Sequence, residues 1–294
     1  MSINFTSGSE LLGLCNKNNI KIFEIMLVRE VYISQRNKDL IINEMRESLE
    51  VMKKAIERGL TEDIRSISGL TGGDAKKLRH YYEKNQTVAG QDLNKAVAAA
   101  MAVLEVNAAM GQIVAAPTAG SSGILPGSII TTAERFGKTE EDIINALFTA
   151  AAVGYLITRN ATVAGAEGGC QAETGSAAAM AAAAIVEMLG GTPEQALNAA
   201  AMSIKNIMGL VCDPIAGLVE APCIKRNAIG TANALISADM ALAGITSIIP
   251  FDEVVEAMLK VGRSLPCELR ETGTGGLAGT PTGKQIHEQI FGKS

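Results

Sequence analysis

The chain has 294 residues, 47% of them hydrophobic, which is enough to bury the core of one large domain or two small ones. A formal net charge of −5 and an isoelectric point near 5.3 offer no basic surface to a phosphate backbone, so we expect no nucleic-acid partner. Aromatic residues make up only 3% of the chain, and alanine and glycine dominate its middle, which predicts helices that pack closely.

Neither export nor membrane insertion is expected. The first residues lack a charged start followed by a sustained apolar stretch. The mean hydropathy is +0.20, but charged residues interrupt the apolar stretches, as Glu173 and Glu187 do on either side of residues 177–186. None of these stretches reaches about 18 uncharged apolar residues, the length that a membrane span needs. We therefore predict a cytoplasmic protein without a membrane partner, whose cysteines stay reduced.

The first third of the chain is rich in charge and has helical periodicity. We predict helices over residues 24–34 and 40–60, and in the second of these Leu49, Met52 and Ile56 recur at helical spacing between charged residues. Residues 1–90 are therefore predicted to form an N-terminal helical arm in front of an all-helical domain over residues 91–294.

Alanine-rich helices separated by glycine-rich loops are predicted for that domain. They are expected at about residues 92–111, 128–136, 139–157, 175–189, 193–208, 228–243 and 251–262. Asp92 is the predicted N-cap of the first, and Thr192 before Pro193 is typical of a helix start. No segment has the alternating pattern of a strand, and no tandem repeat is visible, so the predicted fold class is all-α.

Three cysteines are candidate metal ligands. Cys170, Cys212 and Cys223 lie beside glycine or proline in EGGCQAETG, GLVCDP and EAPCIKRN. Such residues hold the backbone in turns, so the sulfurs could converge instead of lying along a helix. The alternative is that the thiols pack as small hydrophobes. A structural zinc site would need four ligands, usually in close pairs. Three thiolates instead suit a [4Fe–4S] cluster with one open corner, and a helix following Cys170 would lower the pKa of its thiol.

Two further segments carry candidate substrate-binding residues. The loop PTAGSSGILPG combines exposed backbone N–H groups with the hydroxyls of Thr118, Ser121 and Ser122, which suits a carboxylate or a phosphate, although a plain turn between helices is the alternative. Arg226, directly after Cys223, could pair with a substrate carboxylate or be an ordinary surface arginine. The glycine-rich segment RETGTGGLAGTP indicates only that its backbone approaches another group closely.

The ordered motifs EVNAAMG, PTAGSSG, EGGCQAETG, LVCDP, APCIKRNAIG and RETGTGGLA resemble the iron–sulfur-dependent L-serine dehydratases. The resemblance covers most of residues 90–281 and is to the alpha subunit of the two-subunit form. It implies an all-helical catalytic domain. It also implies a [4Fe–4S] cluster on Cys170, Cys212 and Cys223, and a serine-contacting loop that contains Thr118 together with Ser121 and Ser122.

The implied reaction removes water from L-serine to give 2-aminoacrylate, which becomes pyruvate and ammonia, with the open iron of the cluster as Lewis acid. The base that removes the alpha proton is unassigned, because neither His80 nor His287 lies in a matching motif. We expect it on the beta subunit with which this family pairs, and a higher oligomer is possible. The resemblance also implies that single-chain relatives have an added domain and a cysteine-bearing tail, and we expect neither in this chain. Cys267 could be a fourth ligand, but a non-ligand thiol is expected.

Three other functions stay open at this point. A pyridoxal phosphate enzyme could run the same reaction, with Lys205 as the Schiff base and the AGSSG loop around the phosphate, but such enzymes usually contain strands. A non-catalytic subunit could hold a structural metal through the same cysteines. A related desulfidase could use the same loops to act on cysteine.

Overall fold

The computed structural model describes residues 4–292, and over this range the chain is helical without a named strand, which confirms the all-α prediction. The α-helices are α1 (Gly8–Asn18), α2 (Ile22–Ser34), α3 (Lys38–Thr61), α4 (Asp74–Lys84), α5 (Gln91–Ala108), α6 (Ile124–Arg135), α7 (Glu140–Asn160), α8 (Gly165–Gly168), α9 (Ser176–Met188), α10 (Pro193–Asn206), α11 (Cys223–Leu242), α12 (Phe251–Ser264) and α13 (Pro281–Phe291). The shorter helical turns are η1 (Ala119–Ser121), η2 (Gln171–Gly175), η3 (Ile215–Gly217) and η4 (Cys267–Leu269).

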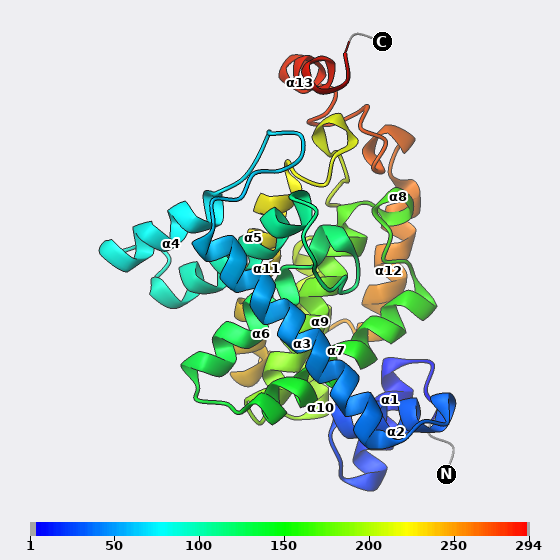
Figure 1. Ribbon diagram of the computed structural model, residues 1–294. Helices are drawn as coiled ribbons and strands as arrows, with labels where there is room; N and C mark the ends of the chain where they lie inside the picture. The colour runs from blue at the N-terminus through cyan, green and yellow to red at the C-terminus, as the bar shows by residue number, and fades with distance from the viewer. Residues whose placement is uncertain (1–3, 293–294) are drawn as a thin grey trace.

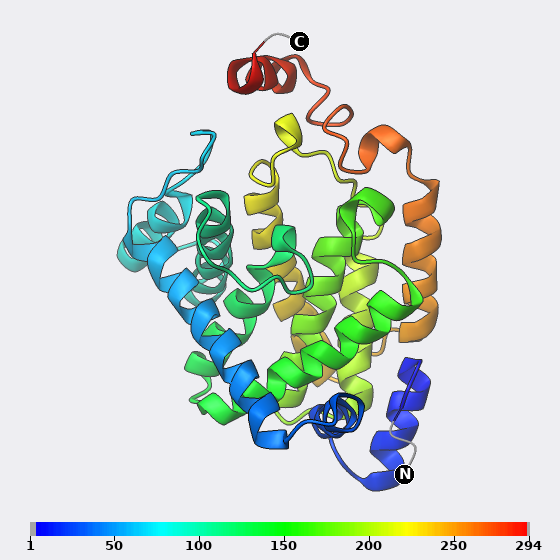
Figure 2. The same ribbon diagram turned by 45° about the vertical axis from the view of Figure 1, so that its right-hand side comes forward.

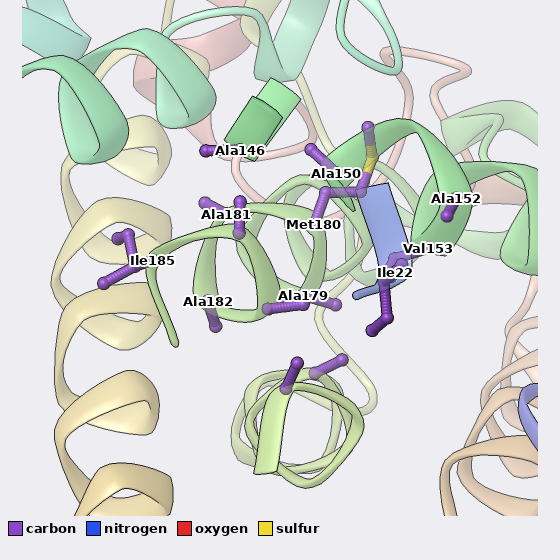
Figure 3. Packing of buried hydrophobic residues seen from close by; sticks show 14 of the residues in the cluster. Ile22, Ala146, Ala150, Ala152, Val153, Ala179, Met180, Ala181, Ala182 and Ile185 are labelled. Atoms are coloured by element: carbon purple, nitrogen blue, oxygen red, sulfur yellow. The ribbon is translucent and has the colours of Figure 1, made fainter. Parts of the chain in front are cut away.

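Helix α9 is the centre of the molecule. All of its residues are buried, and α6, α7, α10 and α11 pack around it. Figure 3 shows Met180 and Ala181 of this helix close to Ala146 and Ala150 of α7. Since most of the side chains of α9 are methyl groups, its neighbours can approach from every side. The alanine-rich composition therefore produces the close helix packing that was predicted.

The N-terminal helices pack onto this core. Helix α3 runs diagonally across the face seen in Figure 1 and lies against α5, while α2 lies against α7. At Gly59 of α3 the approach is so close that a Cβ would lie 2.5 Å from the carbonyl oxygen of Ala102. Leu49 and Met52 are buried in the same apolar cluster as the residues of α7 and α9. The division between an arm and a domain at residue 90 stays a prediction.

Most of the predicted helices are present, although several begin elsewhere. Helix α6 begins at Ile124, before the predicted residue 128, and α11 begins at Cys223, before residue 228. Asp92 is not an N-cap, because Gly90 has that position and Asp92 lies in the first turn of α5. The predicted start of α10 at Thr192 is confirmed, since its hydroxyl accepts a hydrogen bond from the N–H of Gln195 (3.2 Å).

Four helices, α1, α4, α8 and α13, were not predicted. Helices α1 and α4 begin where a carboxylate from a distant helix accepts hydrogen bonds from their free N–H groups. Asp252 of α12 accepts from the N–H of Gly8 (2.6 Å), and Glu105 of α5 accepts from the N–H of Asp74 (2.7 Å). The cap of α4 is a tertiary contact that no local pattern announces, whereas α1 also has a local cap, because the hydroxyl of Ser7 accepts from the N–H of Glu10 (3.1 Å).

One described helix, α7, is long and apolar enough to cross a membrane by length and composition, and 67% of its apolar window is buried inside the protein. Figure 2 places the two chain ends at opposite ends of the molecule. Helix α13 lies beyond the end of the helical bundle and packs against η3.

Candidate functional site

Cys170 lies where the chain enters the central helix. The residue is 5% exposed, and its Sγ lies 3.1 Å from Oγ1 of Thr174. It precedes η2, whose π-helical hydrogen bonding is a form often found at functional sites. Gln171 secures this turn, because its amide nitrogen donates to the carbonyl oxygens of Gly168 (2.9 Å) and Met258 (3.0 Å). The position of Cys170 is thus fixed from two sides.

Cys212 joins two loops that are far apart in the sequence. Its N–H donates to the carbonyl oxygen of Leu269 (2.9 Å), and its carbonyl oxygen accepts from the N–H of Glu271 (2.7 Å). These hydrogen bonds form a parallel bridge with Arg270, and Cys212 itself is 3% exposed. The glycine-rich segment that begins at residue 270 therefore contacts the residue predicted to be a metal ligand.

Cys223 is the first residue of α11 and is 8% exposed. The prediction that all three cysteines lie in turns instead of helices is therefore wrong for Cys170 and Cys223, which both begin helical segments. Only Cys212 lies in extended chain. Both helical cysteines are nevertheless at N-terminal ends, where a helix offers its positive pole to a thiolate.

Cys170 influences the other two thiols electrostatically. Burial is the largest cause that raises the pKa of Cys223, and the charges of Cys170 and Glu173 add to it, so that the pKa reaches about 12. Burial is also the largest cause of the raised pKa of Cys212. The charges of Cys170, Glu173, Glu271 and Cys223 raise it further. Cys170 and Cys223 therefore both lie within electrostatic reach of Cys212.

Burial also dominates at Cys170, where it raises the pKa despite the hydrogen bond from Thr174 and the positive charge of Arg226. Burial therefore outweighs these lowering contributions, and the lowering effect of the helix N-terminus stays a prediction. A bound metal changes the balance, because its charge stabilises the thiolate directly. Three buried thiols, of which Cys170 and Cys223 lie within electrostatic reach of Cys212, fit an iron–sulfur cluster, because thiolates are the donors that such a cluster takes.

Glu173, on η2, is a site residue that the sequence reasoning missed. Its Oε1 accepts a hydrogen bond from Oγ1 of Thr118 (2.7 Å), and its Oε2 lies 3.8 Å from Sγ of Cys212. Burial is the main cause that raises the pKa of this carboxyl group. The one available signal was its position three residues after Cys170, which places both on one face of a helical turn. Glu173 connects the predicted substrate loop with the predicted metal ligands.

A second missed carboxyl group, that of Glu271, lies beside the first. Ligand atoms of Glu173, Cys212 and Glu271 all lie within 4.8 Å of one another, so the three could hold a metal ion. Glu271 has a φ angle of 66°, a left-handed conformation that is rare and strained for a residue with a side chain. The bridge to Cys212 holds it there. Gly165 lies against this group, since a Cβ on it would be 2.7 Å from Oε2 of Glu173.

The predicted substrate loop borders this group through one residue. Thr118 is half-buried, whereas Ser121 and Ser122 are fully buried. The hydroxyl of Ser122 donates to the carbonyl oxygen of Ala119 (2.8 Å), and the N–H of Gly123 donates to Oδ1 of Asn227 (3.1 Å). Much of the loop's hydrogen-bonding capacity therefore stabilises its own shape, and Thr118 is the hydroxyl nearest to the carboxyl groups.

Arg226 lies near the cysteines but already has protein partners. Its Nη2 forms an ion pair with Oδ1 of Asp213 (2.7 Å), and its Nη1 donates to the carbonyl oxygen of Val211 (2.8 Å). Oδ2 of Asp213 accepts from the N–H of Leu277 (2.7 Å), which ties the glycine-rich segment to the same pair. The arginine therefore holds two site loops together, and its contact with a substrate carboxylate stays a prediction.

The remaining residues considered from the sequence lie in other settings. Cys267 is exposed on η4, and His80 is exposed on α4. His287 is half-buried on α13, beside the ring of Phe291. The amine of Lys205, on α10, donates to the carbonyl oxygen of Ser247.

A family profile described as "Serine dehydratase alpha chain" matches residues 17–278. A probable L-serine dehydratase alpha chain of Bacillus subtilis is 52% identical over 98% of this chain and 96% of its own length. The L-serine dehydratase alpha chain of Peptoniphilus asaccharolyticus is 50% identical over 96% of this chain and 97% of its own length. The L-serine dehydratase of Streptomyces coelicolor is 37% identical over 93% of this chain but only 60% of its own length. The similarity thus includes all the site segments described above.

Proposed function

Since the chain belongs to the serine dehydratase alpha chain family, we propose that it forms the part of an L-serine dehydratase that binds a [4Fe–4S] cluster and removes water from L-serine. The products would be pyruvate and ammonia, formed from 2-aminoacrylate. The observation that carries the cluster proposal is the burial of the three thiols, together with the electrostatic effect of Cys170 and Cys223 on Cys212 and of Cys170 on Cys223.

In the proposed site Cys170, Cys212 and Cys223 would hold the cluster as thiolates. When bound, it would supply a Lewis acid for the departing hydroxyl group of the substrate. The chain itself supplies the setting for this chemistry. Burial of the three cysteines keeps bulk water away, and a low local dielectric strengthens every charge interaction nearby.

The substrate is proposed to lie between the cysteines and the loop that contains Thr118, Ser121 and Ser122. The two buried serines would shape this loop, and Thr118 would orient the carboxyl group of Glu173 toward the site. Arg226 has N–H groups beyond the two that bind Asp213 and Val211, and these are proposed to receive the substrate carboxylate.

A beta subunit is the proposed partner, because the names of the two most similar relatives described above contain "alpha chain". We propose that it supplies the base that removes the alpha proton, and that the assembled enzyme works in the cytoplasm. A pyridoxal phosphate mechanism is disfavoured, since residues 4–292 form no strand of an alpha/beta scaffold.

Anaerobic reconstitution with iron and sulfide tests the proposal. About four irons per chain, a broad brown absorbance that is lost in air, and pyruvate formation from L-serine with the beta subunit present are expected. Zinc in place of iron would indicate a structural metal site and contradict the dehydratase mechanism. A resolved aldimine band would indicate pyridoxal phosphate instead. Faster release of hydrogen sulfide from L-cysteine than of pyruvate from L-serine would identify a desulfidase.

A further inference from the structure

Asn227 is a fully buried polar residue that the proposed chemistry does not use. It lies on α11, one turn after Cys223. Its Nδ2 donates to the carbonyl oxygens of Gly120 (2.8 Å) and Cys223 (3.0 Å), and its Oδ1 accepts from the N–H of Gly123 (3.1 Å). Both N–H donors and the oxygen of this amide therefore have backbone partners. A buried amide with a full set of partners fixes those partners relative to one another.

The partners of this amide in the predicted substrate loop lie on either side of its two serines. Gly120 belongs to η1, and Gly123 lies directly before α6, so one amide holds the chain before and after Ser121 and Ser122. Helix α5 lies against the same loop, since a Cβ on Gly123 would be only 2.0 Å from the carbonyl oxygen of Ala100. The loop is therefore fixed by polar contacts to α11 and by close packing on α5.

The same face of α11 also meets the chain on either side of the proposed site. Gly230 lies three residues after Asn227, which places both on one face of the helix. A Cβ on Gly230 would lie 2.4 Å from Cδ1 of Ile124 and 2.9 Å from Cγ2 of Thr174. Ile124 directly follows the loop, and the hydroxyl of Thr174 lies 3.1 Å from Sγ of Cys170. This face of α11 therefore relates the loop to the predicted metal ligands.

We propose that Asn227 is a positioning residue that fixes the predicted substrate loop relative to Cys223. The inference rests on the proposed function, in which L-serine lies between this loop and the cysteines. The loop and α11 are far apart in the sequence, since 104 positions separate Gly123 from Asn227, and the amide bonds to both at once. Because its N–H groups and its oxygen already bind backbone, Asn227 acts on the substrate through the loop. A loop that is ordered in advance does not have to be ordered when the substrate binds.

Hydrogen exchange in the anaerobic alpha–beta holoenzyme tests whether the amide fixes the loop. In Asn227→Ala the backbone N–H groups of residues 118–123 should exchange at least about tenfold faster than in the wild type, because the loop opens more easily. The matched control is Asn198→Ala, at the other end of the molecule. Asn198 has the same pattern of contacts, since it donates to the carbonyl oxygen of Glu194 (3.0 Å), one turn earlier, and accepts from the distant N–H of Ser247 (2.7 Å). Its replacement should leave exchange in residues 118–123 unchanged.

Steady-state kinetics with the same proteins tests whether the fixed loop serves the substrate. In Asn227→Ala the KM for L-serine should rise at least about tenfold and kcat should fall less than about threefold, because the bound substrate orders the loop again. Iron content and visible absorbance should match those of the wild type, since the amide contacts the carbonyl oxygen of Cys223 and not its thiol. Asn227→Asp keeps the acceptor for Gly123 and should show the same changes to a smaller extent. It decides the question if Asn227→Ala does not fold.

The outcomes separate this inference from the proposed function. A wild-type enzyme that holds no iron or forms no pyruvate contradicts the proposed function, and the inference falls with it. With an active wild type, unchanged exchange of residues 118–123 in Asn227→Ala, or faster exchange with an unchanged KM, overturns only the inference. An iron content that falls in step with kcat would also overturn it and assign the amide to the cluster. The same changes in Asn198→Ala would reduce the effect to a general loss of stability.

Discussion

The thiols of Cys170, Cys212 and Cys223 are buried, and burial is the first cause of the raised pKa of each. Without a metal they therefore hold their protons at neutral pH. Because iron and zinc bind the thiolate, loading of the site has to release these protons. Under the proposed function the cluster would thus be loaded onto three buried, protonated thiols, and each cysteine should matter for loading.

Replacement of Cys223 by serine should abolish cluster loading, because a hydroxyl is a poor iron ligand and two thiolates remain. The matched control is Cys267→Ser, whose thiol is exposed on η4. After anaerobic reconstitution, iron analysis should give about four irons per chain for the control and less than about one for Cys223→Ser. A full complement of iron in Cys223→Ser would remove this cysteine from the ligand set.

The candidate cysteines could be predicted because glycine and proline mark their neighbourhoods in the sequence. Glu173 could not, since its significance depends on Thr118, which is 55 residues away and reaches it only in the folded chain. Glu271 was missed for the same reason, because the bridge between Cys212 and Arg270 brings it to the site. Local patterns thus indicate ligands, while long-range contacts decide which carboxyl groups accompany them.

Glu187 gives a pH prediction outside the site. Its buried carboxyl group accepts hydrogen bonds from the N–H groups of Ile22 (2.7 Å) and Phe23 (3.1 Å), and burial raises its pKa above the ordinary 4.5. The folded state therefore binds this proton more tightly than the unfolded state. The resulting stabilisation is complete below the ordinary pKa and is lost as the pH rises through the raised value.

Urea unfolding of the wild type and Glu187→Gln at several pH values between about 5 and 8 tests this prediction. The free energy of unfolding of the wild type relative to Glu187→Gln should fall as the pH rises, because glutamine cannot ionise. Glu194→Gln, at an exposed position in the first turn of α10, should leave the pH dependence unchanged. A wild-type advantage that grows with pH would show that the folded state prefers the ionised carboxyl group.

At the scale of elements, long-range caps decide where several helices begin. Glu187 of α9 accepts hydrogen bonds from the first N–H groups of α2, and Glu105 of α5 accepts hydrogen bonds from those of α4. The sequence pattern indicated α3 because it has a strong apolar stripe, and α2 because it is largely apolar. It missed α4, whose sequence DAKKLRHYYEK is short and charge-rich. The local caps at Thr139 and Thr192 were predictable, since their partners lie within one turn.

The close contact between α3 and α5 depends on Gly59, because glycine has no side chain. In Gly59→Ala the added Cβ would lie 2.5 Å from the carbonyl oxygen of Ala102 and 2.6 Å from its Cα, so the helices must separate. We expect a loss of about 1–3 kcal/mol in the free energy of unfolding. Gly13→Ala on α1 is the matched control, because nothing lies within 4 Å of the added Cβ. That change should be neutral or slightly stabilising. Equal stability of the two variants in urea unfolding would refute the close approach.

At the scale of the whole molecule, the segments that carry the site gather at one end. Figures 1 and 2 show α8, η3 and η4 at the end of the bundle where α13 lies, while α1 and α2 lie at the other end. Thr118, Glu173 and Glu271 are half-buried at this site. A partner that completes the site would therefore approach this end of the molecule and leave the buried core around α9 undisturbed.

This arrangement predicts that the chain with its cluster turns over L-serine poorly by itself. The proposed cluster would activate the hydroxyl group of the substrate, but the proposed base lies on the beta subunit, and removal of a general base typically costs about 100- to 10,000-fold in rate. Pyruvate formation should be measured anaerobically with the reconstituted chain alone and with increasing amounts of the beta subunit, at constant iron content. The rate should rise until the two chains are equimolar. Full activity of the chain alone would place the base on this chain, and a rise in rate that only follows a rise in iron content would limit the partner to protecting the cluster.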